Sequence, residues 1–283
     1  MNKSNFGQMK GKDIFFRSHN FGELCVSLSK PKLTEIQSAE LSMLIGCGEQ
    51  LTTIQKKKRD GLIAKRDAPI QLGEGGKSLV KRIFNETIRN TYRQNIESAY
   101  TQKGNELENF AIQRIARVNG WGICVKNTET FQDLIGYGTP DVFKQKQRIG
   151  FDAKCSFTDE TFPLWDNELK NTNYIWQDKR YAMLCGLDSW FTAYSLENSP
   201  EEIVVKHAYQ LLKKSGEMQM TDSFLDDVRA LHNFDHLADW ERVKTFEVKL
   251  TDEDVKIAEL AAKLGREYFD ELLDNYNSRK PTI

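Results

Sequence analysis

The chain has 283 residues, 40 lysines and arginines against 41 aspartates and glutamates, a formal charge of −1 and a mean hydropathy of −0.58. That composition is typical of a water-soluble globular protein. No segment approaches the roughly 18 apolar residues of a membrane-spanning helix, and residues 1–5 lead into no apolar run of a signal peptide. We therefore expect neither a membrane protein nor a secreted one, but a protein of the cytoplasm.

The cysteines favour the same compartment. They are Cys25, Cys47, Cys124, Cys155 and Cys185. Their number is odd, and no CxxC pair or histidine at metal-ligand spacing accompanies them. We therefore expect neither a disulfide scaffold nor a zinc finger.

Positive charge is concentrated at the front of the chain. Residues 1–100 carry 17 basic and 10 acidic residues, a net +7, which leaves 23 basic and 31 acidic residues, a net −8, in 101–283. The densest basic run, from Lys56 to Arg59, could attract a polyanion. It could equally be a solvated helix face.

Apolar residues at helical spacing predict helices over 33–44, 77–92 and 105–118. In the third, Glu108 lies on the apolar side, because three apolar residues follow it at helical spacing. They are Ala111, Ile112 and Ile115. A carboxylate there is costly unless it is hydrogen-bonded, paired or bound to a cation. Glu106 shares its side with polar residues, and we expect it to be solvated.

Strand-like runs broken by glycines and polar turns follow at 121–126, 137–143 and 149–155. In the third run, alternation places Asp152 and Lys154 on one face. If the last two runs form a hairpin around Lys146, the numbers of paired residues sum to 293 and Asp141 lies opposite Asp152. Opposed residues have Cβ atoms about 4.5–5.5 Å apart, where like charges repel, and a divalent cation would reverse that penalty.

The downstream pattern completes a mixed α/β fold. A helix is predicted over 173–185, with Gln177 and Tyr181 on one face, followed by a strand over 190–196. A strand over 243–250 and a long helix over 251–275 close the chain. The order of helix, three strands, helix and strand predicts a mixed sheet flanked by helices.

These patterns bring together residues suited to one kind of chemistry. Asp141, Asp152 and Glu108 offer the hard oxygen ligands that Mg²⁺ and Mn²⁺ prefer, and Lys154 is adjacent. Such an ion can polarise a phosphoryl oxygen and activate water, while a fixed cation stabilises the charge that develops on the phosphate. The set therefore indicates phosphodiester hydrolysis.

The sequence resembles the PD-(D/E)xK nuclease superfamily. The match consists of Pro140-Asp141, ten residues, then Asp152-Ala153-Lys154, with an upstream Gly104-xxx-Glu108 and a downstream Gln177-xxx-Tyr181. The two flanking motifs are similar to those of the λ-exonuclease, YqaJ and RecB-like branch. The opening Phe15-Phe16-Arg17-Ser18 and the closing strand and helix also resemble phage-type members. The likeness is strong over 104–196 and softer outside that range.

This resemblance implies a role for each matched residue. Asp141 and Asp152 would bind the metal, with the Ala153 carbonyl as a further ligand and Glu108 bound directly or through water. Lys154 would be the catalytic lysine. Gln177 and Tyr181 would organise the site and the DNA end. Asp152 stands where many relatives have glutamate, which could alter the metal geometry.

The resemblance also implies a restriction-endonuclease-like core. Because no internal repeat or low-complexity linker stands out and the six prolines are dispersed, we expect one integrated domain over 1–283. We expect a basic, mainly helical region over 1–100, a catalytic core over 104–196 and a strand-plus-helix extension over 197–283. The implied function is a Mg²⁺- or Mn²⁺-dependent exonuclease that resects double-stranded DNA ends in phage-type recombination or repair. A homo-oligomer, a single-strand-annealing partner protein and a bacterial or phage-infected cell would fit. No cysteine follows Cys185, so the iron–sulfur cluster of some relatives is not expected.

Two other functions stay open at this point. A catalytically silent nuclease fold could bind DNA or a protein, although such a module has no reason to keep opposed carboxylates. An endonuclease would cut internally. Three aromatic residues could stack on bases, and we expect at least two of them to pack in the core instead. They are Trp165, Tyr174 and Trp176.

A glycine-rich segment resembles a phosphate-binding loop only in part. Residues 73–78 end in Lys77-Ser78, but Gln71 stands where that motif needs glycine, and we expect no strand before it. Nucleotide hydrolysis is therefore not favoured. A helix that begins at Gly76 could still hold a DNA phosphate with its free N–H groups, with Lys77 and Ser78 as the contacts.

Overall fold

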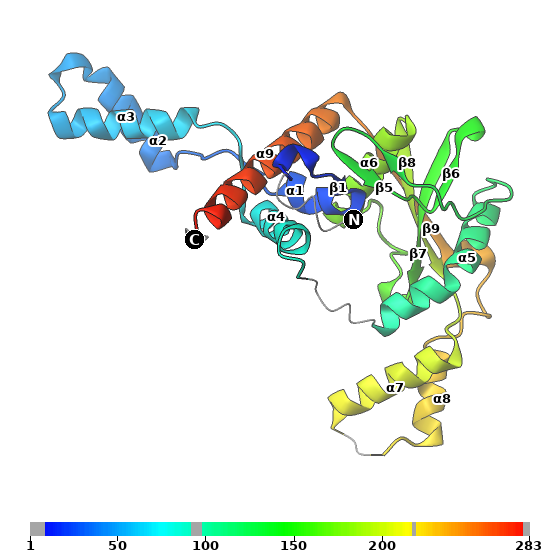
Figure 1. Ribbon diagram of the computed structural model, residues 1–283. Helices are drawn as coiled ribbons and strands as arrows, with labels where there is room; N and C mark the ends of the chain where they lie inside the picture. Colours follow the sequence, from blue (N-terminus) through cyan, green and yellow to red (C-terminus); the bar gives the residue numbers. More distant parts are fainter. Residues whose placement is uncertain (1–8, 92–97, 217–218, 280–283) are drawn as a thin grey trace. The chain divides into compact units, whose positions relative to one another are not determined.

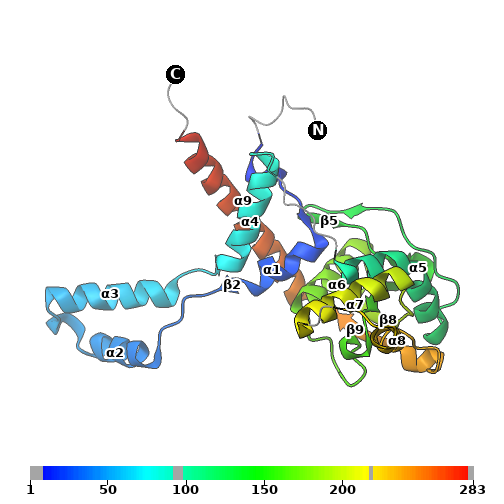
Figure 2. The same cartoon turned by 90° about the horizontal axis from the view of Figure 1, so that it is seen from below.

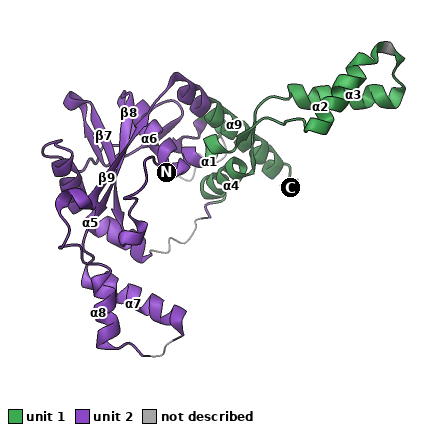
Figure 3. Ribbon diagram, turned by 180° about the vertical axis from the view of Figure 1, so that it is seen from behind, with its two compact units in different colours: residues 1–12, 23–89, 260–283 green, residues 13–22, 90–259 purple. Residues whose placement is uncertain are grey.

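The structure is a computed structural model, and it describes residues 9–91, 98–216 and 219–279. Its residues group into two compact units (Figure 3). Unit 1 comprises residues 1–12, 23–89 and 260–283, and unit 2 comprises residues 13–22 and 90–259. These units cut across the three regions predicted from the sequence. The single integrated domain over 1–283 stays a prediction.

Unit 2 is built around a mixed four-stranded sheet in the order β6-β7-β8-β9 (Figure 1). The strands are β6 (Val142–Lys144), β7 (Ile149–Ser156), β8 (Ser189–Leu196) and β9 (Val243–Lys249). β7 and β8 run parallel, and the other neighbours are antiparallel. A parallel pair needs a crossover, and helix α6 (Thr172–Cys185) supplies it. The predicted mixed α/β fold is confirmed, as are the predicted helix over 173–185 and the strands over 149–155, 190–196 and 243–250.

The β6–β7 hairpin has the predicted register. Its pairs, such as Val142 with Phe151, sum to 293. Four residues join the strands: a 3-10 turn over Gln145–Gln147, then Arg148 in the left-handed region at φ 52°. One step beyond the last pair, this register places Asp141 against Asp152.

Helix α5 (Ala99–Val118) covers one face of the sheet. Its residues Ala111, Ile112 and Ile115 pack with Phe151 of β7 in a buried cluster. The spacing of these residues gives the helix an apolar stripe. The helix begins six residues before the predicted 105 because Ser98 caps it, accepting a hydrogen bond from the Thr101 N–H.

Helix α6 packs on the opposite face, where Tyr181, Ala182 and Trp190 form a buried cluster. Gly150 of β7 lies against the Trp190 ring, because a Cβ atom at Gly150 would come within 2.0 Å of a ring carbon. Successive side chains of a strand alternate between faces. Asp152 and Lys154 therefore lie on the same face as Gly150, toward α6.

The predicted strand over 121–126 is wrong. Gly120 and Gly122 adopt φ values of 68° and 69°, which interrupt an extended chain, and the Trp121 carbonyl accepts a hydrogen bond from Lys144 Nζ rather than from a strand. The predicted strand over 137–143 holds only at its two ends. The chain turns at Pro140 and Asp141, which separates β5 (Gly136–Gly138) from β6.

Unit 2 contains two further pieces. A small sheet has the order β1-β5-β4, with β1 (Phe16–Arg17) and β4 (Phe131–Gln132). Helices α7 (Glu201–Ser215) and α8 (Asp222–Ala230) pack through Val204, Ala208 and Val228. These two helices fall in the region 197–283, for which only a strand and one helix were predicted.

In unit 1, helices α2 (Glu35–Gly46) and α3 (Thr53–Asp67) form a hairpin (Figure 2). Thr34 and Thr52 cap them, each in a capping box with a glutamine three residues on. The hairpin has its own small core, formed by Leu41, Leu44, Leu51 and Leu62. The predicted helix over 33–44 is confirmed.

The remaining elements of the front are α1 (Phe21–Val26), β2 (Leu28–Ser29), β3 (Gln71–Leu72) and α4 (Glu74–Thr87). The helix predicted over 77–92 is thus wrong at both ends. It begins at Glu74 with Gly73 as its N-cap, and it ends at Thr87; Tyr92 lies outside the described residues.

Helix α9 (Asp252–Asn277) confirms the long helix predicted over 251–275. Thr251 caps it, accepting a hydrogen bond from the Asp254 N–H, while the Asp254 carboxylate accepts one from the Thr251 N–H. Its length is 26 residues, but charges interrupt its sequence throughout. Over the described ranges, no helix is both long enough and apolar enough to cross a membrane.

Candidate active site

Three of the predicted site residues converge on the α6 side of the sheet. Asp141 precedes β6, and Asp152 and Lys154 lie on β7. The turn that carries Asp141 is held by Asn127, whose backbone N–H donates to the Asp141 carbonyl at 2.7 Å and whose side chain donates to the Pro140 carbonyl at 3.0 Å. The Pro-Asp dipeptide is therefore fixed beside the middle of β7.

The carboxylates are held in different ways. Asp141 Oδ2 accepts a hydrogen bond of 2.8 Å from the Ala153 N–H. Asp152 is only 3% exposed and forms an ion pair with Lys154. Within the described residues, Asp152 Oδ2 has this ion pair but no hydrogen bond of regular geometry. The site therefore contains a buried carboxylate whose described charge partner is the single ammonium group of Lys154.

The charges of two carboxylates and one ammonium group act on one another at this site. Burial and the Asp152 charge raise the pKa of Asp141 to about 9, although Lys154 and the Ala153 N–H act against this. Burial disfavours the charge on Lys154, but the Asp152 and Asp141 carboxylates outweigh burial and raise the pKa of the ammonium group. Lys154 is thus a fixed cation rather than a base.

Helix α6 brings Gln177 and Tyr181 to the same side of the sheet. Gln177 Nε2 donates to the Tyr181 hydroxyl at 3.1 Å, and that hydroxyl donates to the Thr139 carbonyl at 3.3 Å. The Tyr181 ring packs on Trp190, with centroids 5.5 Å apart. Tyr181 therefore combines a packing role with a polar link to the segment before Asp141, while its role toward DNA stays a proposal.

Glu108 is not joined to this group by any described hydrogen bond or ion pair. It lies on α5, its side chain is 21% exposed, and it forms an ion pair with Lys126. Pairing with a cationic side chain is one of the three ways in which an acid on the apolar side of a helix was expected to be stabilised. Glu106 is exposed and accepts a hydrogen bond from Gln102, as expected of a solvated residue.

The three aromatic residues are not in the core. Trp165 is 88% exposed, and Tyr174 and Trp176 are partly exposed. The expectation that at least two would be buried is therefore wrong. Lys154 Nζ lies 4.6 Å from the Tyr174 ring centroid, and Lys179 lies 4.8 Å from the Trp176 ring. Tyr174 and Trp176 thus each have a lysine ammonium group near the ring.

The glycine-rich segment differs from its prediction in two respects. The short strand β3 precedes it, and the helix begins at Glu74 rather than at Gly76. The Lys77 N–H already donates to the Gly73 carbonyl, so it is not free for an anion. The Lys77 side chain pairs with Glu74 at 3.3 Å, and Ser78 is exposed. Any phosphate contact of these two residues would come from their side chains.

No three acidic, histidine or cysteine side chains in the described residues are grouped closely enough to hold a metal ion by themselves. The donor set still fits a divalent cation. Asp141 and Asp152 supply hard oxygens from facing positions, and Lys154 is the ammonium group that pairs with Asp152. A small, hard cation such as Mg²⁺ binds one or two carboxylates and keeps several waters.

Asp178 was not among the residues predicted from the sequence. It is fully buried on α6, directly after Gln177. Tyr181, Ala182 and Cys185 follow it by three, four and seven residues, the same pattern that drew attention to Glu108. Applied to this helix, the pattern would have found a second carboxylate on an apolar stripe.

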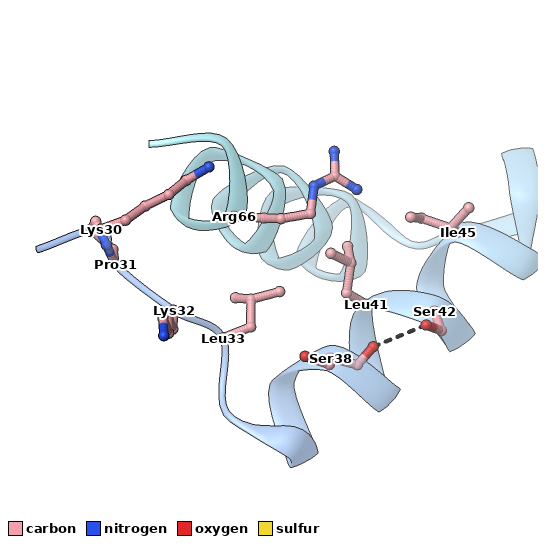
Figure 4. A pocket seen from close by; sticks show the side chains of 9 residues that line it. All are labelled: Lys30, Pro31, Lys32, Leu33, Ser38, Leu41, Ser42, Ile45 and Arg66. Carbon is pink, nitrogen blue, oxygen red and sulfur yellow. Dashed lines mark hydrogen bonds between the residues drawn. The ribbon is translucent and has the colours of Figure 1, made fainter. Parts of the chain in front are cut away.

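A hollow of about 480 Å³ belongs to unit 1, whereas the carboxylates belong to unit 2. Leu33 and Leu41 point from its floor toward the helix that bears Arg66 (Figure 4). Lys30, Lys32 and Arg66 are the charged residues that line it. Arg66 is itself paired with Asp67.

Solved structures of other proteins have a similar fold. No protein-family model and no curated protein matches the chain. A phage-related exonuclease from Haemophilus somnus 129PT is similar over 93% of this chain and 96% of its own, with a TM-score of 0.65 and 19% identity. An alkaline exonuclease from Laribacter hongkongensis is similar over 98% and 99%, with a TM-score of 0.50 and 13% identity. The chain therefore has the fold of these exonuclease structures.

Proposed function

We propose that this chain is a Mg²⁺- or Mn²⁺-dependent DNA exonuclease that resects double-stranded ends. One observation carries the proposal: the β6–β7 register sets the Asp141 carboxylate against Asp152, with Lys154 beside them. Opposed buried carboxylates are unfavourable without a cation, so the arrangement favours a metal site over a silent module. The shared exonuclease fold supports end resection over internal cleavage.

The site residues would have different roles in the hydrolysis of DNA. Asp141, Asp152 and the Ala153 carbonyl would hold the ion, with Glu108 reaching it directly or through water. The bound ion supplies Lewis-acid activation of water and of the phosphoryl group. In hydrolysis a water oxygen bonds to phosphorus, the bond from phosphorus to the sugar oxygen breaks, and that oxygen gains a proton. Lys154 stabilises the negative charge that develops on the phosphate.

Gln177 and Tyr181 would orient the reacting end of the DNA from helix α6. Lys77 and Ser78 would contact phosphates from unit 1, together with the basic run from Lys56 to Arg59. Phosphate contacts of this kind position the strand without reading its sequence. We include a homo-oligomer and a single-strand-annealing partner in the proposal, which follow from the family resemblance, and a cytoplasmic location, which follows from the composition and the cysteines.

Digestion of labelled DNA tests the proposal. Purified protein with Mg²⁺ or Mn²⁺ should release nucleotides from linear duplexes and leave closed circular DNA intact. Lys154→Ala should lower the rate by about 10²–10³-fold, the typical loss on removing one electrostatic stabiliser of a transition state. Lys249→Ala, an exposed lysine on β9, is the matched control and should keep full activity.

Three results would contradict the proposal. Full activity of Lys154→Ala would refute the assignment of the catalytic lysine. Nicking of circular DNA would replace the exonuclease with an endonuclease. Absence of both activity and Mn²⁺ binding, measured by calorimetry, would favour a silent nuclease fold. Duplexes labelled separately at the 5′ and 3′ ends would give the polarity.

A further inference from the structure

Asp178 is a buried acid with one polar partner and no assigned task. Its exposure is 0%, and the Thr192 hydroxyl donates to its Oδ2 at 2.5 Å. Its Oδ1 has no hydrogen bond from the described residues. Burial raises the pKa of this carboxyl well above its ordinary value, and the nearby Asp152 charge adds to the effect. Burial therefore favours the protonated form of this group more strongly than water does.

The partner of Asp178 connects it to the candidate active site. Thr192 on β8 is the register partner of Asp152 on the parallel strand β7. The hydrogen bond between Asp178 and Thr192 therefore ties helix α6 to the sheet next to Asp152. Gln177 and Tyr181 are carried by the same helix, one residue before Asp178 and three residues after it.

Apolar packing by itself sets the rotation of a helix loosely. On this face α6 also packs Tyr181 and Ala182 against Trp190, and rings and methyl groups tolerate small shifts. Other hydrogen bonds and ion pairs of α6 side chains reach residues outside β7 and β8: Tyr181 to the Thr139 carbonyl, Lys179 to Asp254 and Arg180 to Asp133. A buried hydrogen bond is directional, so it selects one arrangement among several that would pack comparably. A rotation of the helix would displace Gln177 directly, because Gln177 is adjacent to Asp178 in the chain.

We propose that Asp178 is a positioning residue of the nuclease site, which holds Gln177 and Tyr181 in place beside Asp152 and Lys154 through its hydrogen bond with Thr192. The proposal rests on the proposed function. In this role Asp178 would act through Thr192 and the helix, not by contact with metal or substrate. Thr192→Val removes the hydroxyl at nearly constant shape, Thr192→Ser keeps it, and Asp178→Asn keeps an oxygen that can accept from Thr192.

Kinetics of these variants give the first test. Thr192→Val should lower kcat by about 10–100-fold, the usual loss when a group that orients a site residue is removed. Thr192→Ser and Asp178→Asn should stay near the wild-type value. In a Gln177→Ala background, Thr192→Val should lower kcat by a smaller factor than in the wild-type background, because part of its effect passes through Gln177 and residues that act through one another do not contribute additively. A purely structural role would give the same loss in both backgrounds.

Two further measurements do not need activity. Amide hydrogen exchange along α6 should become faster in Thr192→Val and stay unchanged in Thr192→Ser, while the Mn²⁺ affinity measured by calorimetry should be the same in all variants. If wild-type protein fails to cut DNA, the proposed function fails, and hydrogen exchange still decides whether Asp178 anchors the helix. The proposal is overturned if Thr192→Val keeps its full kcat and exchange protection, or if Asp178→Asn is as inactive as Lys154→Ala.

Discussion

Asp141 accepts its 2.8 Å hydrogen bond from Ala153, the residue that follows its cross-strand neighbour Asp152. The bond extends the β6–β7 register one step past the last backbone pair and fixes the Asp141 carboxylate beside β7. A backbone donor favours the charged form of an acid, yet burial and the Asp152 charge raise the Asp141 pKa to about 9. At neutral pH the metal-free site therefore keeps a proton that cation binding would release.

Replacing Asp141 should separate metal binding from stability. The pKa of Asp141 is higher in the folded chain than the usual value of about 3.9, so the folded state binds more protons between these values. The contribution of the Asp141 carboxyl to the free energy of unfolding therefore falls as the pH rises from about 4 to about 9. Asp141→Asn should raise the thermal midpoint of chelator-treated protein at pH 8, with a smaller gain at pH 5, and should abolish Mn²⁺ binding. A lower midpoint at pH 8 would refute this account.

Removing Lys154 should destabilise the fold as well as stop the chemistry. Asp152 has a side chain only 4% exposed, and without the ammonium group its charge is uncompensated. Breaking a buried pair at one partner costs about 3–5 kcal/mol, and we expect Lys154→Met to fall near the lower end. Urea denaturation checks this. The double variant Asp152→Asn, Lys154→Met should recover most of the loss, and no recovery would argue against the ion pair.

His232 should produce acid sensitivity. It is 2% exposed, and its ring nitrogens contact Ser199 at 2.7 Å and His207 at 2.8 Å. Burial, Lys103 and His207 lower its pKa to about 4. The unfolded chain then binds more protons between pH 4 and about 6.5, so stability rises with pH across that interval, by an amount on the order of 3 kcal/mol. His232→Asn should lose this slope in denaturant titrations, while exposed His236→Asn should keep it.

Gly150 should tolerate no side chain. A Cβ atom there would lie 2.0 Å from the Trp190 ring, which is itself fully buried. Gly150→Ala should therefore cost at least about 1–3 kcal/mol, as overpacked cores do. Gly61→Ala is the matched control: this residue lies inside α3 with open space around it, and the change should stabilise the chain by up to about 1 kcal/mol. Equal effects of the two substitutions would contradict the packing argument.

Lys77 should affect DNA affinity rather than catalysis. Lys77→Ala should weaken duplex binding to a similar degree for all sequences. It should also lower the magnitude of the slope of log affinity against log salt concentration by about 1. Fluorescence anisotropy over a salt series measures both. Lys263→Ala, an exposed lysine that pairs with Glu267 on α9, should leave the slope unchanged. An unchanged slope for Lys77→Ala would remove this residue from the DNA contacts.

The sequence by itself determined the strand that carries Asp152 and Lys154 and the helix that carries Gln177. The period-two alternation of β7 placed Asp152 and Lys154 on one face, and the hairpin pattern gave the register that pairs Asp141 with Asp152. The helical stripes of α5 and α6 were also visible. These features follow from local geometry, because the repeat of a strand or helix decides which neighbours share a face.

Only the tertiary structure decided which hydrogen-bond or ion-pair partner each side chain contacts. The sequence around Trp121 is typical of a strand. In the structure it is not one, because the glycines on either side adopt positive φ values and the Trp121 carbonyl accepts a hydrogen bond from Lys144. Glu108 on its apolar stripe found Lys126, and Asp178 found Thr192 on a strand 14 residues away. Hydrogen bonds and ion pairs across such separations depend on how the elements pack, and several partners satisfy one sequence pattern equally well until packing selects one.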